Sequence, residues 1–306
     1  MRRLHIFLIA LLMMISVSAL QAQRAKLISF REIDNFPSAS TVLSSSGRLY
    51  VTGDDSRHIF IFDEEFQVVD SVRIFSNREY RIPKNVKADI ESSLFFEGDK
   101  IMLIGSGSAP LRRRRFVVDR SHQVSEIKSR KLFRYMNKGV SPLNIEGSCM
   151  VGSRVLLANR RTEGGDNTVF IADANRFRKG DVGRLSSFNI LLPDSLQYTA
   201  ISDITFDDKS TTLLMTLSTE ETKDPVLDGP VGRSYVGWIR NFRVLANNDV
   251  SICGVYPLDL LDPAFGSRKV EGITVEQSSE SRFVIVLVSD NDDGKSAIFR
   301  ISLDTD

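Results

Sequence analysis

The sequence predicts an all-β protein, a β-propeller of five four-stranded blades, from three observations. Short runs rich in Val, Ile, Phe and Leu alternate with turns of Gly, Asp, Asn and Ser, which is the pattern of strands and turns. A Glu-Gly step followed by a β-like run occurs at Glu146-Gly147 and again at Glu271-Gly272, which indicates an internal repeat. The last repeat ends one strand short, while an unassigned β-like run stands at residues 26–33.

The N-terminal residues 1–22 have the pattern of a secretory signal peptide. Arg2 and Arg3 precede an apolar stretch at residues 4–17, and small residues suited to cleavage follow it. An uncleaved anchor is the alternative, although a membrane span normally needs about 20 apolar residues. We therefore expect residues 23–306 to form a single propeller domain that is periplasmic or secreted, with no membrane span after signal cleavage.

Charge is balanced along the chain. Without the two leader arginines, 38 Lys and Arg residues face 39 Asp and Glu residues, and no tail carries a block of charge. A chain that is near neutral as a whole predicts no generic attraction to nucleic acid or to a membrane surface. The only two cysteines, Cys149 and Cys253, stand in apolar runs. In an exported protein they could pair, or each could remain a small buried side chain, and the sequence leaves both outcomes open.

The repeats divide the chain into five sets of strands. Residues 26–33 would supply the missing strand of the last set, because a blade built from both termini closes the ring and removes exposed edges. Six blades are the alternative if the segments 221–233 or 176–186 hide another sheet, and a two-sheet sandwich is the alternative fold. The strands expected in the successive repeats are residues 40–45, 48–55, 58–64 and 67–75; 91–98, 100–108, 113–120 and 123–133; 146–152, 154–161, 167–175 and 187–194; 202–208, 211–219, 234–242 and 250–258; and 271–277, 282–292 and 296–303.

The repeat places polar residues on one rim of the expected central channel. In a propeller blade the first strand lines the channel and the second runs back, so the start of the first and the end of the second meet. Glycine after the acid would let neighbouring backbone approach closely. The strand starts carry Glu91, Glu146, Asp203 and Glu271, and the strand ends carry Asp54, Asp55, Ser106, Ser108, Asn159, Arg160, Ser218, Asp290 and Asp292.

Converging carboxylates predict one of two arrangements. They could bind a hard cation, since Ca²⁺ takes six to eight oxygen ligands, or each acid could bond a neighbouring blade's backbone or a base such as Arg160 or Lys269. Repulsion among carboxylates requires a cation or basic partners. The expected metal ligands are Glu91, Glu146, Asp203, Glu271 and Asp290.

The segment at residues 105–115 reads GSGSAPLRRRR and is the most unusual local stretch. Its backbone N–H groups and arginines could hold a phosphate or carboxylate, or the arginines could form ordinary ion pairs. The Lys-Ser/Thr of a nucleotide-binding P-loop is missing, and no GxSxG, HExxH or CxxC motif occurs in the chain. The ligand-binding residues expected from these patterns are Glu91, Glu146, Glu271, Ser106, Ser108, Arg112, Asn159 and Arg160.

Residues 87–115 and 143–160, together with 269–275, resemble an uncharacterised family of bacterial propellers, a domain of unknown function, in which an acid-rich strand start precedes a GSGS-and-Arg segment. More distantly, they look similar to the esterase-like propeller domains named after phytase. That second resemblance implies calcium at the rim carboxylates.

Two functions follow from these features. The first is an exported ligand-binding or interaction module that works through its polar, acidic rim, with a small anionic ligand or an envelope protein as partner. The alternative is a calcium-dependent phosphoesterase or esterase-like hydrolase that uses the same rim, with calcium as the expected cofactor in that case alone.

Overall fold

The computed structural model describes residues 24–306 apart from positions 35, 37, 141, 162–164, 182–184, 197, 221–230, 245–247, 267 and 291–294. The predicted leader at residues 1–22 therefore lies outside the described residues, as does most of the segment 221–233. No described helix is long and apolar enough to cross a membrane.

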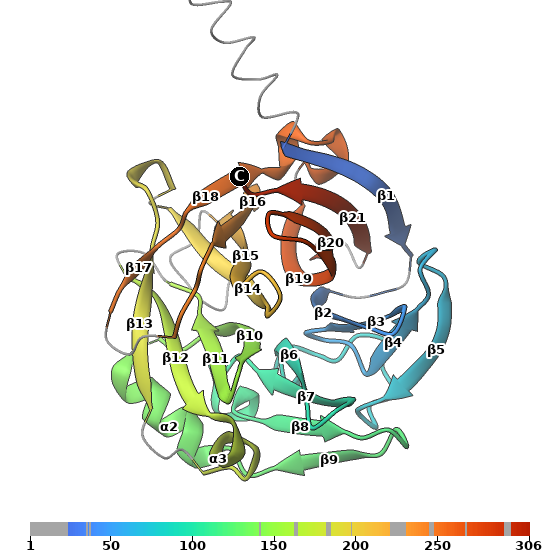
Figure 1. The fold of residues 1–306 in the computed structure, drawn as a ribbon. Helices are drawn as coiled ribbons and strands as arrows, with labels where there is room; N and C mark the ends of the chain where they lie inside the picture. The colour runs from blue at the N-terminus through green and yellow to red at the C-terminus, as the bar shows by residue number, and fades with distance from the viewer. Residues whose placement is uncertain are drawn as a thin grey trace, which may run out of the picture.

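The described strands form five sheets around a central axis, each with four antiparallel strands, which is a five-bladed β-propeller (Figure 1). The predicted fold and blade count are confirmed. Blade one contains β2 (Ala39–Ser45), β3 (Arg48–Gly53), β4 (His58–Phe62) and β5 (Val68–Arg73). Blade two contains β6 (Ile90–Phe96), β7 (Lys100–Gly105), β8 (Arg115–Val118) and β9 (Val124–Ile127). Blade three contains β10 (Ile145–Val151), β11 (Arg154–Asn159), β12 (Asn167–Asp173) and β13 (Ser186–Leu191). Blade four contains β14 (Thr199–Asp207), β15 (Thr212–Glu220), β16 (Val231–Ile239) and β18 (Gly254–Pro257). Blade five contains β19 (Lys269–Ser278), β20 (Arg282–Asp290), β21 (Ser296–Asp304) and β1 (Ala25–Ile33).

Closure of the ring follows the prediction. Strand β1 pairs antiparallel with β21, with Ile33 opposite Ser296. The rings of Phe30 and Phe299 stack across this pair with their centroids 4.8 Å apart. The N-terminal strand thus covers the edge that β21 would otherwise expose.

Two expected strands differ from the structure. The strand expected at residues 123–133 ends at Ile127, and the chain continues into helix α2 (Arg130–Gly139). Leu132, Phe133 and Met136 lie on its buried side, because this spacing places them on one face of a helix.

The run at residues 250–258 is divided between two blades. Its first part, β17 (Val250–Ser251), pairs in parallel with β13 of blade three, and the second part is β18 of blade four. Gly254 lies opposite Trp238 in that pair, and a Cβ atom at Gly254 would come within 2.3 Å of the indole ring. Glycine therefore leaves the space that the buried Trp238 fills.

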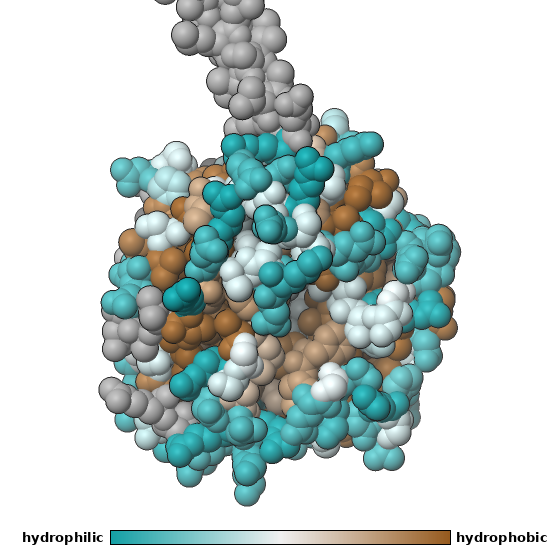
Figure 2. All heavy atoms as spheres, viewed as in Figure 1, coloured by the Kyte–Doolittle hydropathy of each residue, from teal (hydrophilic) through white to brown (hydrophobic). Residues whose placement is uncertain are grey.

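Five hydrophobic clusters fill the five interfaces between successive blades. For example, one cluster contains Leu103 of blade two and Ile59 of blade one, and another contains Leu156 of blade three and Leu213 of blade four. On the face in Figure 2, hydrophilic side chains cover most of the outer border, and hydrophobic ones are visible among them toward the middle. Because these clusters pack on both sides of each sheet, they fix the inner strands relative to one another.

The two cysteines are free thiols, of which Cys149 is buried and Cys253 is exposed.

Candidate functional site

Every blade has one extra residue near the start of its inner strand. At this point the pairing of the first two strands shifts by one, so that the extra residue has no partner across the sheet. Such a β-bulge changes the direction of a side chain without breaking the sheet. The extra residues of blades one to five are Ser40, Glu91, Glu146, Ser202 and Glu271. The equivalent positions at the ends of the second strands are Asp54, Ser106, Arg160, Ser218 and Asp290. We call these ten residues the channel mouth.

The two Glu-Gly steps have a common cause. A Cβ atom at Gly147 would lie 2.6 Å from the backbone nitrogen of Ile204 in blade four, and one at Gly272 would lie 3.0 Å from the Cα of Thr41 in blade one. The bulge therefore carries the glutamate, while glycine allows the inner strand of the next blade to approach.

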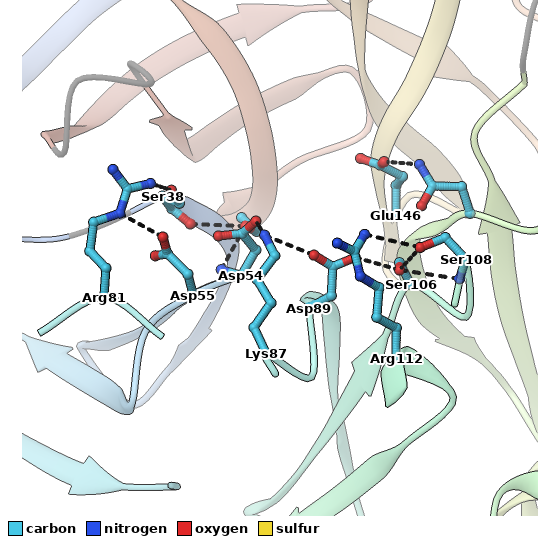
Figure 3. Close-up of polar contacts among 12 residues, drawn as sticks. Ser38, Asp54, Asp55, Arg81, Lys87, Asp89, Ser106, Ser108, Arg112 and Glu146 are labelled. Carbon is cyan, nitrogen blue, oxygen red and sulfur yellow. Dashed lines mark hydrogen bonds and ion pairs between the residues drawn. The ribbon is translucent and has the colours of Figure 1, made fainter. Parts of the chain in front are cut away.

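An ion-pair network connects blades one and two (Figure 3). The ammonium group of Lys87 contacts Asp54 and also lies 2.8 Å from Oδ1 of Asp89. The other oxygen of Asp89 accepts hydrogen bonds from Arg112 Nη1 at 2.8 Å and from Ser106 Oγ at 2.5 Å. Lys87 and Asp89 are both buried. Because a buried charge is costly unless it is paired, these partners are what stabilise the charged form of each residue.

Asp89 occupies the place that the sequence suggested for an outside anion. Ser106 and Arg112 both bond its carboxylate, and Arg112 also donates to Ser108 Oγ at 3.1 Å. The three residues expected to capture an anion thus meet around a carboxylate of the same chain.

Blade three supplies Glu146, Asn159 and Arg160. Nη1 of Arg160 lies 3.5 Å from Oε2 of Glu146, and its guanidinium donates to the hydroxyls of Ser202 and Ser218 in blade four at 3.4 and 3.2 Å. Asn159 accepts the backbone N–H of the residue before β10, Asn144, at 2.7 Å. Arg160 thus binds two blades together at the mouth, and Asn159 fixes the turn.

Asp203 does not belong to the channel mouth, contrary to its place in the expected metal site. The extra residue of blade four is Ser202, and Asp203 is the next residue along. Its carboxylate is buried and accepts the backbone N–H groups of Ile204 at 2.7 Å and of Ile273 in blade five at 3.0 Å. Of the two arrangements expected for the acids, Asp203 therefore adopts the one in which an acid bonds the backbone of a neighbouring blade, and not the one in which it binds a cation.

Glu271 and Asp290 are the two residues that blade five contributes to the channel mouth, and Asp290 pairs across the sheet with Lys269. The ammonium group of Lys269 lies 2.6 Å from Oε1 of Glu271. Burial raises the pKa of Glu271 to about 8. The charge of Lys269 lowers this pKa, whereas the negative charges of Asp290 and Glu146 raise it. Glu271 therefore holds a proton over much of the neutral range.

Glu91 is surrounded by other acids. Burial raises its pKa well above the ordinary value, and the charges of Asp89, Asp54, Glu146 and Glu271 raise it further. Glu91, Glu146 and Glu271 occupy the same bulge position in blades two, three and five, so the structure brings them to one end of the channel. Glu91 makes no hydrogen bond or ion pair with any residue that the structure describes.

The sequence pattern indicates neither Lys87 nor Asp89 at the site, and it places Asp54 on the rim without assigning it as a ligand. Asp54, Asp89 and Glu91 each offer an oxygen within 4.8 Å of the other two. Burial raises the pKa of Asp54 to about 6, against the effect of Lys87. A sequence signal for these partners exists: a polar residue two places before the bulge glutamate, as in Asp89-Ile90-Glu91.

Comparison with known proteins agrees with this architecture. The model of a family of unknown function, DUF6929, matches residues 35–303. The chain belongs to the DUF6929 family. No curated protein matches it.

Two solved structures share the fold of this DUF6929 chain. Glutaminyl cyclase from Myxococcus xanthus aligns with a TM-score of 0.55 at 12% identity over 92% of this chain and 96% of its own. The major allergen Mala s 1 from Malassezia sympodialis aligns with a TM-score of 0.51 at 12% identity over 90% and 96% of the two chains. At this identity the likeness shows the fold alone.

Proposed function

We propose that this propeller is an exported ligand-binding module that receives a positively charged group at its channel mouth. The observation that carries the proposal is Glu91. It is a partly buried carboxyl group among four other acids, and it has no bonded partner among the described residues. The likeness to glutaminyl cyclase is one of fold, and we propose no cyclase activity from it.

The charges around Glu91 favour a cation over an anion. Asp89 is paired with Lys87 and Arg112, Glu146 lies beside Arg160, and Glu271 beside Lys269. Burial and the charges of Asp89 and Asp54 raise the pKa of Glu91, which favours its protonated form in the absence of a ligand. A bound cation would compensate the negative charge of Glu91 and release the proton. An anionic ligand would instead have to displace the carboxylate of Asp89 from Ser106 and Arg112.

The cation could belong to a small amine or to a Lys or Arg side chain of an envelope protein, since both present the same group to the mouth. The predicted leader at residues 1–22 supports an exported location, where such partners would be met. A free amine and a lysine-containing peptide distinguish these two sources.

Calcium-dependent hydrolysis of phosphoesters is the second candidate. It is favoured by the approach of Asp54, Asp89 and Glu91 to within 4.8 Å and by the buried Oδ1 of Asp54, which has no hydrogen-bond partner among the described residues. These three oxygens suit a hard cation, which could activate a water molecule for attack on phosphorus. Of the metal ligands expected from the sequence, only Glu91 belongs to this group of three. The other expected ligands, which are not part of it, are Glu146, Asp203, Glu271 and Asp290.

A thermal-shift series tests both candidates. A ligand at a hundredfold excess over its Kd should stabilise the protein by about 2.7 kcal/mol. We expect a primary amine or a lysine-containing peptide to raise the melting temperature of the unmodified protein. Glu91→Gln should lose most of that rise because it removes the carboxylate and keeps the shape.

The matched control is Glu280→Gln, which changes an exposed acid in the turn between β19 and β20, at the opposite end of these strands from the mouth, and should keep the full rise. Stabilisation by calcium together with turnover of p-nitrophenyl phosphate would support the hydrolase. The ligand proposal is overturned if no cation stabilises the protein, or if Glu91→Gln responds like the control.

A further inference from the structure

Helix α2 concentrates positive charge in a chain that is nearly neutral. Between Glu126 and Glu146 the sequence has no Asp or Glu, but it has five Lys and Arg residues. All five are exposed, at Lys128, Arg130, Lys131, Arg134 and Lys138. The balanced total charge therefore hides a strongly basic local surface.

The packing of α2 fixes which side is free. Leu132, Phe133 and Met136 are buried between blades two and three. Phe133 packs beneath the loop after β7, where a Cβ atom at Gly107 would come within 2.7 Å of its ring. The apolar side of the helix is thus committed to the core, and the basic side faces outward together with Tyr135, which is 49% exposed.

Helix α3 (Ala174–Arg178) extends the same basic surface. Buried Arg115 donates to the carbonyl oxygen of Phe177 in α3 at 2.7 Å and to that of Lys128, just before α2, at 2.8 Å. The two helices are therefore held next to each other, as Figure 1 also shows. The exposed cations of α3 and its C-terminal flank are Arg176 and Lys179.

We call the seven exposed residues the basic platform: Lys128, Arg130, Lys131, Arg134, Lys138, Arg176 and Lys179. None of them forms an ion pair with another residue that the structure describes.

Acidic residues near the platform have other partners. Asp173 caps α3 by accepting the backbone N–H of Arg176 at 3.1 Å. Glu126 pairs with Arg114, and Glu97 pairs with Arg178 and Lys100. The positive charge of the platform is therefore not neutralised by the neighbouring described acids.

We propose that the basic platform docks the protein on an anionic lipid surface. A ten-residue helix is about 15 Å long, which spans several lipid headgroups. Lys and Arg side chains on such a helix can each reach a phosphate group without a shaped pocket. Because the apolar side of α2 is buried, attachment is electrostatic and does not insert the helix into the bilayer.

The expectation that this chain has no attraction for membrane surfaces rested on its total charge. Screening limits each charge to a range of about 10 Å at 0.1 M salt, so a surface responds to the nearest charges and not to the sum. A platform on one side of a neutral protein also orients it, with blades two and three against the lipid.

Vesicle sedimentation tests the proposal. We expect the protein to bind vesicles that mix phosphatidylglycerol with phosphatidylcholine, to ignore vesicles of phosphatidylcholine alone, and to be released by added salt. In a variant carrying Arg130→Gln, Lys131→Gln and Arg134→Gln, partitioning onto the anionic vesicles should fall by on the order of a hundredfold, since each Lys or Arg near such a surface strengthens binding about fivefold.

The matched control carries Lys26→Gln, Arg48→Gln and Arg243→Gln, three exposed cations elsewhere on the protein. It removes the same charge and should keep binding within a few-fold of the unmodified protein. Equal melting temperatures for the two triple variants would show that folding does not account for the difference.

Equal binding to neutral and anionic vesicles, or equal losses in the two triple variants, would overturn the proposal. Binding to soluble polyglutamate with none to vesicles would also overturn it and assign the platform to an acidic protein partner.

Discussion

The carboxylate of Asp203 in blade four accepts the backbone N–H of Ile273 in blade five at 3.0 Å. It also accepts the N–H of Ile204 in its own strand at 2.7 Å. One buried side chain thus accepts hydrogen bonds from backbone N–H groups in two blades. It does so where β14 and β19, the inner strands of these blades, lie next to each other. This relationship makes Asp203 part of the framework that holds the channel mouth in shape.

Replacing Asp203 by Asn should destabilise the protein. The amide keeps one acceptor oxygen but turns an NH₂ group toward one of the two backbone donors. Leaving a buried donor without an acceptor costs about 1–3 kcal/mol. Urea unfolding measures the loss. Asp173→Asn is the matched control, because Asp173 also accepts a backbone N–H, at the start of α3, where Asn is an equally good cap. Equal stability of both variants would contradict this role.

Gly147→Ala should also lower stability, by about 1–3 kcal/mol. The added methyl group would lie 2.6 Å from the nitrogen of Ile204 and 2.8 Å from the Cα of Asp203, and both are backbone atoms that cannot move without shifting blade four. Gly139→Ala in α2 is the comparison, since its nearest contact would be 3.6 Å from the ring of Phe170. Chemical denaturation should show a clear loss for the first variant and little change for the second.

The arginine run ends in a buried cation whose loss should be costly. Arg115 is fully buried, donates to Ser129 Oγ and to the carbonyl oxygens of Lys128 and Phe177, and lies over the ring of Phe177. Burial alone lowers the pKa of Arg115 to about 10, and the side chain remains charged at neutral pH. Arg115→Met leaves these acceptors unpaired, so we expect a loss of about 3 kcal/mol or more.

Its neighbour Arg114 provides the control for that substitution. Arg114 pairs with Glu126 through two bonds of 2.9 and 2.7 Å, but the pair is partly exposed. An exposed ion pair contributes about 1 kcal/mol or less, so Arg114→Met should have a small effect on the midpoint of urea unfolding. A larger loss for Arg114→Met than for Arg115→Met would contradict the assignment.

The fold could be predicted because each blade repeats the same order of strands. The unassigned run at residues 26–33 and the short final repeat together required the closure that β1 and β21 show. Helix α2 was missed because ten residues give fewer than three turns. The apolar pair Leu132 and Phe133 extends the β-like run before it, so the helix was assigned to a strand.

The channel mouth could be predicted only in part. Glu91, Glu146 and Glu271 occupy the same step of the repeat in the sequence, and in the structure each is the extra residue of its blade. Asp203 was assigned to the mouth although it stands one residue later, and in a strand a shift of one residue turns a side chain to the other face. Asp89 lies just before β6 with a positive φ of 57°, so no strand periodicity indicates where its carboxylate points.

The buried acids should make the protein less stable as pH rises from about 5 to 8. Burial raises the pKa of Glu271 to about 8 and that of Asp54 to about 6, above the ordinary values of 4.5 and 3.8. In this range the folded protein keeps protons that the unfolded chain has already lost. The folded state is therefore favoured at low pH, and the stabilisation is lost as pH rises through the folded-state pKa values. The expected decrease is on the order of a few kcal/mol.

Urea unfolding at several pH values measures that slope, and Glu271→Gln identifies its main source. The variant keeps an oxygen that can accept from Lys269, which lies 2.6 Å from the carboxylate of Glu271, but it cannot titrate. Its stability should therefore fall less steeply between pH 5 and 8 than that of the unmodified protein. Glu126→Gln is the control, because Arg114 lowers the pKa of that carboxyl group and places its titration below this range. The assignment fails if Glu271→Gln keeps the full slope, since the protons would then be held elsewhere in the mouth.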